Sequence, residues 1–172
     1  MSESTADQAA PVMFGEKLAS SAAFANLFRD GMSLVEETAA YLDGPGRQES
    51  KKLERAAALA YATESMRLTT RLMQLASWLL LHRAVKEGEM SLAQANKEKT
   101  KVKLSVGEPG DPSTIKLLPQ RLRDLIDRSR KLNDQVRRLD ANIYAPPLAP
   151  DRGTGANPVE RQLGLLKAAF ER

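Results

Sequence analysis

The stretch from Gln48 to Glu87 contains neither proline nor glycine, and its apolar residues recur at helical spacing. As a single helix it would be roughly 60 Å long, because an α-helix rises 1.5 Å per residue. It carries two nearly opposite apolar stripes: Leu53, Ala57, Ala60, Tyr61, Leu68, Leu72, Leu75, Leu79 and His82 on one side, and Met66, Thr70, Met73, Ser77 and Leu80 on the other. This pattern predicts either a central helix or one that also contacts a second subunit.

Two further segments show helical periodicity. The first covers about 16–42 and places its apolar residues on one face: Phe14, Leu18, Ala25, Phe28, Met32, Val35, Ala39 and Leu42. We expect it to end at Gly44, with Gly44 in the left-handed conformation and Pro45 forbidding continuation. The third covers about 119–144 and repeats in strict four-three steps, as in a heptad: Leu118, Leu122, Leu125, Ser129, Leu132, Val136, Leu139 and Ile143.

These segments predict an all-α fold, a three-helix bundle of long antiparallel helices at about 16–42, 48–87 and 119–144. The bundle would span residues 14–144, after a disordered N-terminus at 1–13. Residues 88–114 read as a flexible linker with a short helix capped by Ser91 and ending near Lys99. Val102, Leu104 and Val106 alternate with polar residues, but a single strand would have no partner, so an extended loop is expected.

The last residues, 145–172, predict a flexible, disordered tail rich in proline and glycine. Within it, Asn157 and Pro158 suit the start of a short amphipathic helix at 158–171. Its apolar residues are Val159, Leu163, Leu166 and Phe170. Because isolated helices of this length are marginal in water, we interpret this segment as a candidate partner-binding tail.

Composition narrows the classes of function. The chain has no cysteine, which excludes disulfides and thiolate metal sites. The 26 Lys and Arg residues against 22 Asp and Glu leave a net charge of only +4, which argues for no particular partner. The N-terminus lacks the pattern of a secretory signal, and the apolar run 72–81 is too short to cross a bilayer. A protein without membrane insertion is therefore expected.

A search for catalytic motifs finds no candidate active site. His82 is the single histidine, so it cannot form a histidine cluster for a metal, and packing at the core edge is the favoured interpretation. The Gly44-Pro45-Gly46 stretch lacks the spacing of a phosphate-binding loop and reads as a tight turn. We therefore predict that the protein is not an enzyme and uses no cofactor or metal.

The second helix carries the candidate dimer or partner face, made up of Met66, Arg67, Arg71, Met73, Trp78 and Leu80. Glu64, Arg67 and Arg71 suit either an ion pair within the helix or a bridge between helices or subunits, and the sequence does not decide between them. Trp78 suits either the core or an interface. Lys97 to Lys103 leave a basic, helical nucleic-acid-binding protein as the alternative, disfavoured because no aromatic platform accompanies the lysines.

The residues Tyr41 to Arg47, Ala60 to Gln74 and Ala76 to Leu80 resemble the alphaproteobacterial DUF1465 family, and the resemblance extends over about Phe14 to Tyr144. It implies a homodimeric three-helix bundle that is not itself a protease. Family members act as adaptors in cell-cycle-regulated proteolysis by the ClpXP protease machinery, in the cytoplasm and at a cell pole. The resemblance implies that they help deliver substrates such as CtrA, together with other adaptor proteins, and it carries no catalytic motif.

Overall fold

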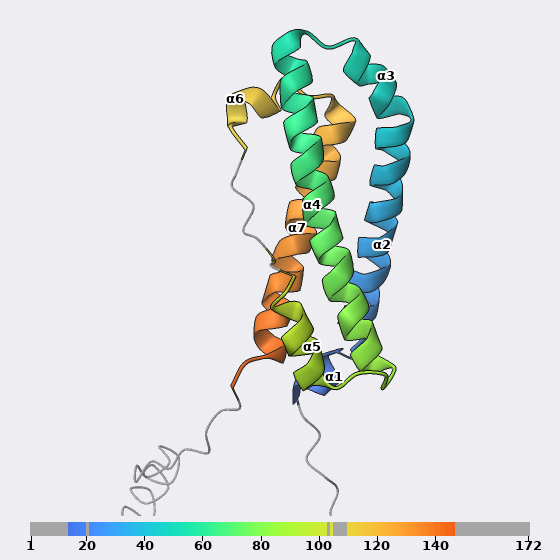
Figure 1. Cartoon of the computed structure of the whole chain (residues 1–172), viewed down its shortest axis with the longest axis vertical. Coiled ribbons are helices and arrows are strands. Elements are labelled where there is room, and N and C mark those ends of the chain that lie inside the picture. Colours follow the sequence, from blue (N-terminus) through green and yellow to red (C-terminus); the bar gives the residue numbers. More distant parts are fainter. Residues whose placement is uncertain (1–13, 20, 103, 105–109, 147–172) are drawn as a thin grey trace, which may run out of the picture.

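The computed structural model describes residues 14–19, 21–102, 104 and 110–146 (Figure 1). Within these ranges every regular element is an α-helix, as predicted, and three long helices dominate the fold. The predicted N-terminal segment 1–13 and almost all of the tail lie outside the described residues. The helices are α1 (Phe14–Ala19), α2 (Ala22–Asp43), α3 (Pro45–Lys51), α4 (Arg55–Lys86), α5 (Leu92–Lys99), α6 (Pro112–Ile115) and α7 (Gln120–Ile143).

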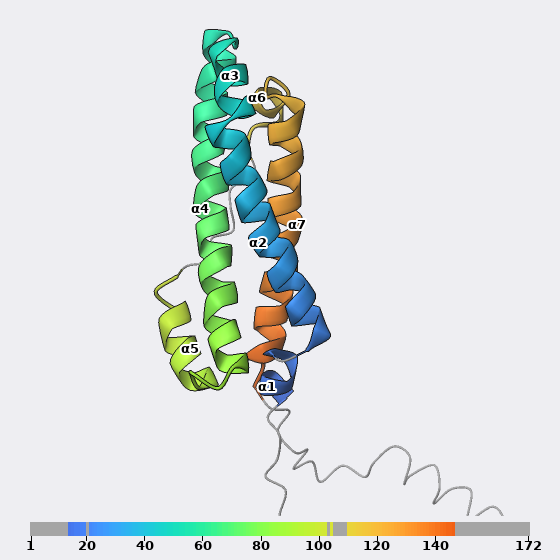
Figure 2. The same ribbon diagram turned by 90° about the vertical axis from the view of Figure 1, so that its right-hand side faces the viewer.

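The three long helices lie side by side, but they are not all antiparallel. Figures 1 and 2 show α2 running opposite to both α4 and α7, while α4 and α7 run in the same direction. Cross-helix contacts agree, since Arg71 reaches Ser129 and, further along both helices, Trp78 reaches Asp140. The prediction of antiparallel helices is therefore wrong for this pair. The long connection through α5 and α6 returns the chain to the end of the bundle where α4 begins, which permits the parallel pairing.

The core lies between these helices and is made mainly of leucines, with Phe24, Tyr41 and Trp78 as its large aromatic side chains. The heptad positions predicted for the third segment are confirmed at Leu118, just before α7, and along α7 itself. All of them are buried except Leu139, which is half-buried. The core stripe predicted for the second helix is largely confirmed on α4, where Ala57, Ala60, Leu68, Leu72, Leu75, Leu79 and His82 are buried.

The buried face of α2 is shifted by one position along the sequence from the predicted face. It consists of Phe24, Leu27, Gly31, Leu34, Thr38 and Tyr41, whereas the predicted Ala25 and Ala39 are exposed. Gly31 explains the shift, because a Cβ atom there would lie only 2.5 Å from Leu79 Cδ1. A glycine at the contact lets α2 approach α4 closely, and an apolar pattern does not register glycine as a core residue.

Both of the first two predicted helices are interrupted. The first divides into α1 and α2. The Ser21 hydroxyl accepts a hydrogen bond from the Phe24 backbone N–H at 3.2 Å and so caps the start of α2. The predicted second helix divides into α3 and α4 at residues 52–54, although no glycine or proline is present there. Gly44 ends α2 at φ −114°, so it is not left-handed as predicted, and Pro45 begins α3.

The connection between α4 and α7 contains the short helix that was predicted at Ser91. The Ser91 side chain caps α5, and the Gln94 side chain accepts a hydrogen bond from the Ser91 backbone N–H. The helix α6 was not predicted. It begins after Asp111, whose carboxylate accepts a hydrogen bond from the Ser113 backbone N–H at 2.9 Å. Leu104 packs against the core, whereas Val106 lies outside the described residues.

None of the helices in the described ranges has the length and apolar character needed to cross a membrane.

Candidate partner interface on the outer face of α4

The side of α4 that faces away from the bundle carries four large apolar residues spaced seven apart. Leu59, Met66, Met73 and Leu80 are 71%, 73%, 65% and 53% exposed. Thr63, Thr70 and Ser77 lie between them, four residues after Leu59, Met66 and Met73. We call this set the outer stripe: Leu59, Thr63, Met66, Thr70, Met73, Ser77 and Leu80.

The spacing of the outer stripe is that of a coiled-coil contact face. A repeat of four and three residues keeps one side of a helix facing a partner over its whole length. From Leu59 to Leu80 this side is roughly 32 Å long, at 1.5 Å per residue. Single exposed apolar residues are ordinary on protein surfaces, but a regular row of them indicates an interaction site.

Two of the three polar residues of the outer stripe, Thr63 and Ser77, direct their hydroxyls to their own helix. The Thr63 hydroxyl donates to the Leu59 carbonyl oxygen at 3.0 Å, and the Ser77 hydroxyl donates to the Met73 carbonyl oxygen at 2.9 Å. A hydroxyl satisfied in this way does not need water, so covering it costs little free energy. These positions are therefore compatible with an apolar partner surface.

The structure corrects two residues of the predicted partner face. Met66, Met73 and Leu80 do lie on the outer stripe, and Arg67 lies partly exposed near it. Arg71 and Trp78, in contrast, are buried in the bundle. They point inward because their polar groups have partners on α7. Leu59 was missed, although it precedes Met66 by the same seven residues that separate Met66 from Met73.

The arginines beside Glu64 take different roles. Glu64 is buried, and Arg67 donates to its Oε1 atom at 2.9 Å, so this pair lies within one helix. Arg71 instead donates to the Ser129 hydroxyl on α7 at 2.7 Å, and burial lowers the pKa of its guanidinium. Gly110 packs against Glu64, since a Cβ atom there would lie 2.6 Å from Oε1. This polar layer joins α4 to α7 and to the segment before α6.

A cluster around Trp78 joins the C-terminal parts of α4, α5 and α7. The Trp78 and His82 rings stack with centroids 4.0 Å apart, and Trp78 Nε1 donates to Asp140 at 2.8 Å. Lys99 on α5 binds the same carboxylate at 2.9 Å, and its ammonium lies 3.8 Å from the centre of the Tyr144 ring. Helix α5 and the end of α7 are thus attached to α4 at one point.

His82 is fully buried, which confirms the interpretation that it packs in the core. Its Nδ1 lies 2.8 Å from the Trp78 carbonyl oxygen, and its Nε2 lies 2.8 Å from the Tyr144 hydroxyl. A carbonyl can only accept, so Nδ1 carries the proton and Nε2 accepts from the hydroxyl. Burial raises the pKa of Tyr144 to about 12, so this hydroxyl keeps its proton.

Because the imidazole of His82 is buried, we expect the protein to lose stability in mild acid. Burial is the largest influence and lowers the pKa of His82 below its usual 6.5, while Asp140 raises it and Lys99 lowers it. The unfolded chain therefore binds a proton first as the pH falls through 6.5, and the free energy of unfolding decreases until His82 also titrates in the folded state. Urea unfolding at several pH values between 8 and 5 measures this slope.

The chain has one histidine, so the variant His82→Gln is the control for this measurement. Its free energy of unfolding is expected to be lower at every pH. It is also expected to change less with pH above the range in which carboxylates titrate. An identical slope in the two proteins between pH 7 and 5.5 would assign the acid sensitivity to other groups.

The lysine run offers less to a phosphate than the sequence indicates. Lys99 is bound to Asp140, and Lys101 pairs with Glu98 at 3.0 Å. Lys103 lies outside the described residues. Two lysines of the run are thus already neutralised by carboxylates, which weakens the nucleic-acid alternative. Across the described ranges, no three His, Asp or Glu side chains are grouped so that they could hold a metal ion.

Comparison with known proteins agrees with the resemblance seen in the sequence. The family model of DUF1465, described as a protein of unknown function, matches residues 15–170. The chain belongs to the DUF1465 family. Among solved structures, the crystal structure of RcdA from Caulobacter crescentus CB15 is 52% identical to it, with a TM-score of 0.63 over 76% of this chain and 98% of that one. No curated protein matches the chain.

Proposed function

We propose that this DUF1465 protein is a non-enzymatic adaptor for regulated proteolysis, which helps deliver cell-cycle regulators such as CtrA to the ClpXP protease. The observation that carries this proposal is the 52% identity to RcdA, the regulator of CtrA degradation, over nearly the whole of that chain. The outer stripe supports it, because an adaptor needs exposed surface for partners. The protein would act in the cytoplasm and at a cell pole, together with other adaptor proteins.

We also propose that the outer stripe joins two copies of the chain. Pairing α4 with its symmetry mate would bury Leu59, Met66, Met73 and Leu80 of both copies along one seam. Each fully buried side chain of this size contributes about 1.5–3 kcal/mol, and a twofold axis doubles the number of buried residues. The heptad spacing favours a helix as the partner element, and a second α4 has the same spacing.

The tail at 145–172 would supply a second contact in each copy. A dimer has two tails, so it can bind a partner that offers two sites with both tails at once. This raises the apparent affinity without a new kind of contact. The partner-binding residues in this proposal are Val159, Leu163, Leu166 and Phe170. They lie outside the described residues, so the sequence pattern alone supports them.

Degradation of CtrA by purified ClpXP, with the other adaptor proteins supplied, tests the adaptor function. Adding the full-length chain is expected to accelerate degradation. The variant Leu163→Ser with Leu166→Ser is expected to lose most of this acceleration while its helicity and oligomeric state stay unchanged. Leu165→Ser is the matched control, because Leu165 lies in the same segment but would fall outside the apolar face of a helix there.

Equal CtrA degradation with and without the chain would contradict the proposal. Tight, steeply salt-dependent binding to DNA in fluorescence anisotropy would instead favour the nucleic-acid-binding alternative.

A further inference from the structure

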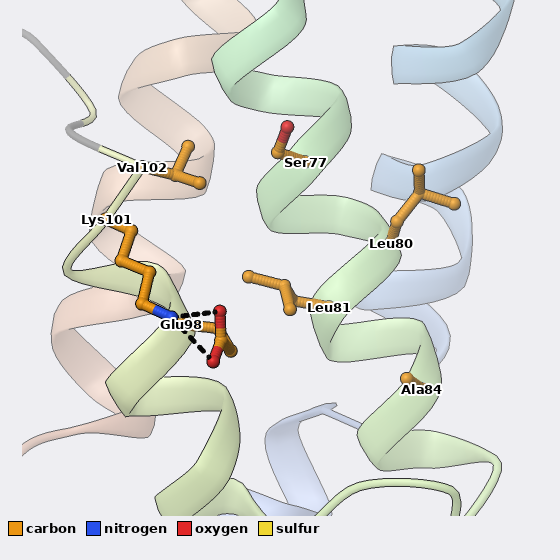
Figure 3. A pocket seen from close by; sticks show the side chains of 7 residues that line it. All are labelled: Ser77, Leu80, Leu81, Ala84, Glu98, Lys101 and Val102. Carbon is orange, nitrogen blue, oxygen red and sulfur yellow. Dashed lines mark hydrogen bonds and ion pairs between the residues drawn. The ribbon is translucent and has the colours of Figure 1, made fainter.

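A groove lies beside the outer stripe, between the last turns of α4 and the end of α5 (Figure 3). Its volume is about 350 Å³. Leu80, Leu81 and Ala84 line it from α4, and Val102 lines it from the residues after α5. Figure 3 shows Leu81 projecting from α4 toward α5, and Ser77, Glu98 and Lys101 complete the lining.

The charged residues of the groove neutralise each other. Lys101 Nζ lies 3.0 Å from Glu98 Oε2, and both residues stand on the α5 side. A rim without net charge does not select a strongly acidic or basic partner. Shape and apolar surface therefore decide what binds, and an apolar helix face suits a shallow apolar groove between helices.

The described chain ends at the same end of the bundle as this groove. Tyr144 follows α7 and contacts His82, the neighbour of Leu81 on α4, and its ring also lies under Lys99 of α5. The two elements that hold Tyr144 are thus the same two that form the groove. Figures 1 and 2 show the end of α7 and the helix α5 at the same end of the bundle.

The length of chain beyond Pro146 fits this location. Residues 147–158 separate the described structure from the apolar residues that begin at Val159. A stretch of this length spans at most about 40 Å when extended, and about 20 Å on average as a coil. Helix α4, with 32 residues, is about 48 Å long. The apolar segment therefore stays mostly near the end of the bundle that carries the groove.

We propose that residues 158–171 dock into this groove of their own chain, with Val159, Leu163, Leu166 and Phe170 facing Leu81, Ala84 and Val102. A short tether holds the segment near the groove at an effective concentration in the millimolar range, which favours it over a segment from another molecule. The consequence for delivery rests on the proposed function: a docked tail hides the residues that capture partners. Partner binding would then compete with docking, so only molecules with an undocked tail could bind a partner through it.

Disulfide cross-linking tests the docking, because the chain contains no cysteine of its own. Full-length Ala84→Cys with Ala169→Cys places one thiol in the groove and one at the edge of the apolar face of the tail. Ala25→Cys with Ala169→Cys is the matched control, since Ala25 is an exposed alanine in the first turn of α2. Figure 1 shows that α2 begins near the end of the bundle that carries α5. Docking is expected to make the intramolecular disulfide form about tenfold faster in the groove variant than in the control.

Adding Leu163→Ser and Leu166→Ser to the groove variant is expected to abolish the difference, with circular dichroism showing that the bundle remains folded. Equal rates for Ala84→Cys and Ala25→Cys would overturn the proposal. Cross-linking that occurs only between molecules would also overturn it, because the occupant of the groove would then be the tail of a second copy. These results do not depend on CtrA degradation, so docking and the adaptor function can fail separately.

Discussion

Replacing Trp78 with alanine is expected to lower the free energy of unfolding by about 4 kcal/mol. Trp78 is 1% exposed, and its ring lies against His82 and 6.1 Å from the Phe24 ring, measured between centroids. Truncation leaves a cavity where α2, α4 and α7 meet, and the cavity accounts for most of the loss. The lost hydrogen bond to Asp140 contributes less, because that carboxylate keeps Lys99 and is partly exposed.

Urea denaturation followed by circular dichroism measures this effect without relying on tryptophan fluorescence. The control is Glu36→Ala at an exposed position of α2, for which a change within about 0.5 kcal/mol is expected. A loss of less than about 1 kcal/mol for Trp78→Ala would show that Trp78 does not hold the three helices together.

Charges on the outer stripe are expected to separate the proposed dimer. In the variant Met66→Glu with Met73→Glu, the dissociation constant should rise by at least about 100-fold, which equals about 2.7 kcal/mol. The twofold axis places four carboxylates in one apolar seam, and each would be desolvated if the dimer formed. The fold of each chain should persist, because Met66 and Met73 are 73% and 65% exposed.

Sedimentation velocity over a range of concentrations measures the oligomeric state of these proteins. Leu117→Glu is the matched control, because Leu117 is an exposed apolar residue outside the outer stripe and should leave the dimer intact. A double variant that dimerises like the natural protein would exclude the outer stripe as the seam. A natural protein that stays monomeric at every concentration would exclude the homodimer itself, and the stripe would then be a surface for other partners.

Local sequence patterns were sufficient for much of this molecule. The four-three repeat from Leu118 to Ile143 predicts the buried side of α7, and Ser91 predicts where α5 begins, because helical periodicity and capping depend only on residues nearby in the chain. The family resemblance rests equally on consecutive residues. The two apolar sides of α4 were also visible, since Met66, Met73 and Leu80 recur seven apart.

The tertiary structure decided which of these sides is covered and by what. Arg71 and Trp78 belong to the core rather than the partner face because Ser129 and Asp140, far along the chain, receive their hydrogen bonds. The parallel course of α4 and α7 follows from a connection whose path no local pattern specifies. Gly31 enters the core only because Leu79 approaches it. Periodicity within one helix determines which residues share a side, whereas burial depends on neighbours that only the folded chain brings together.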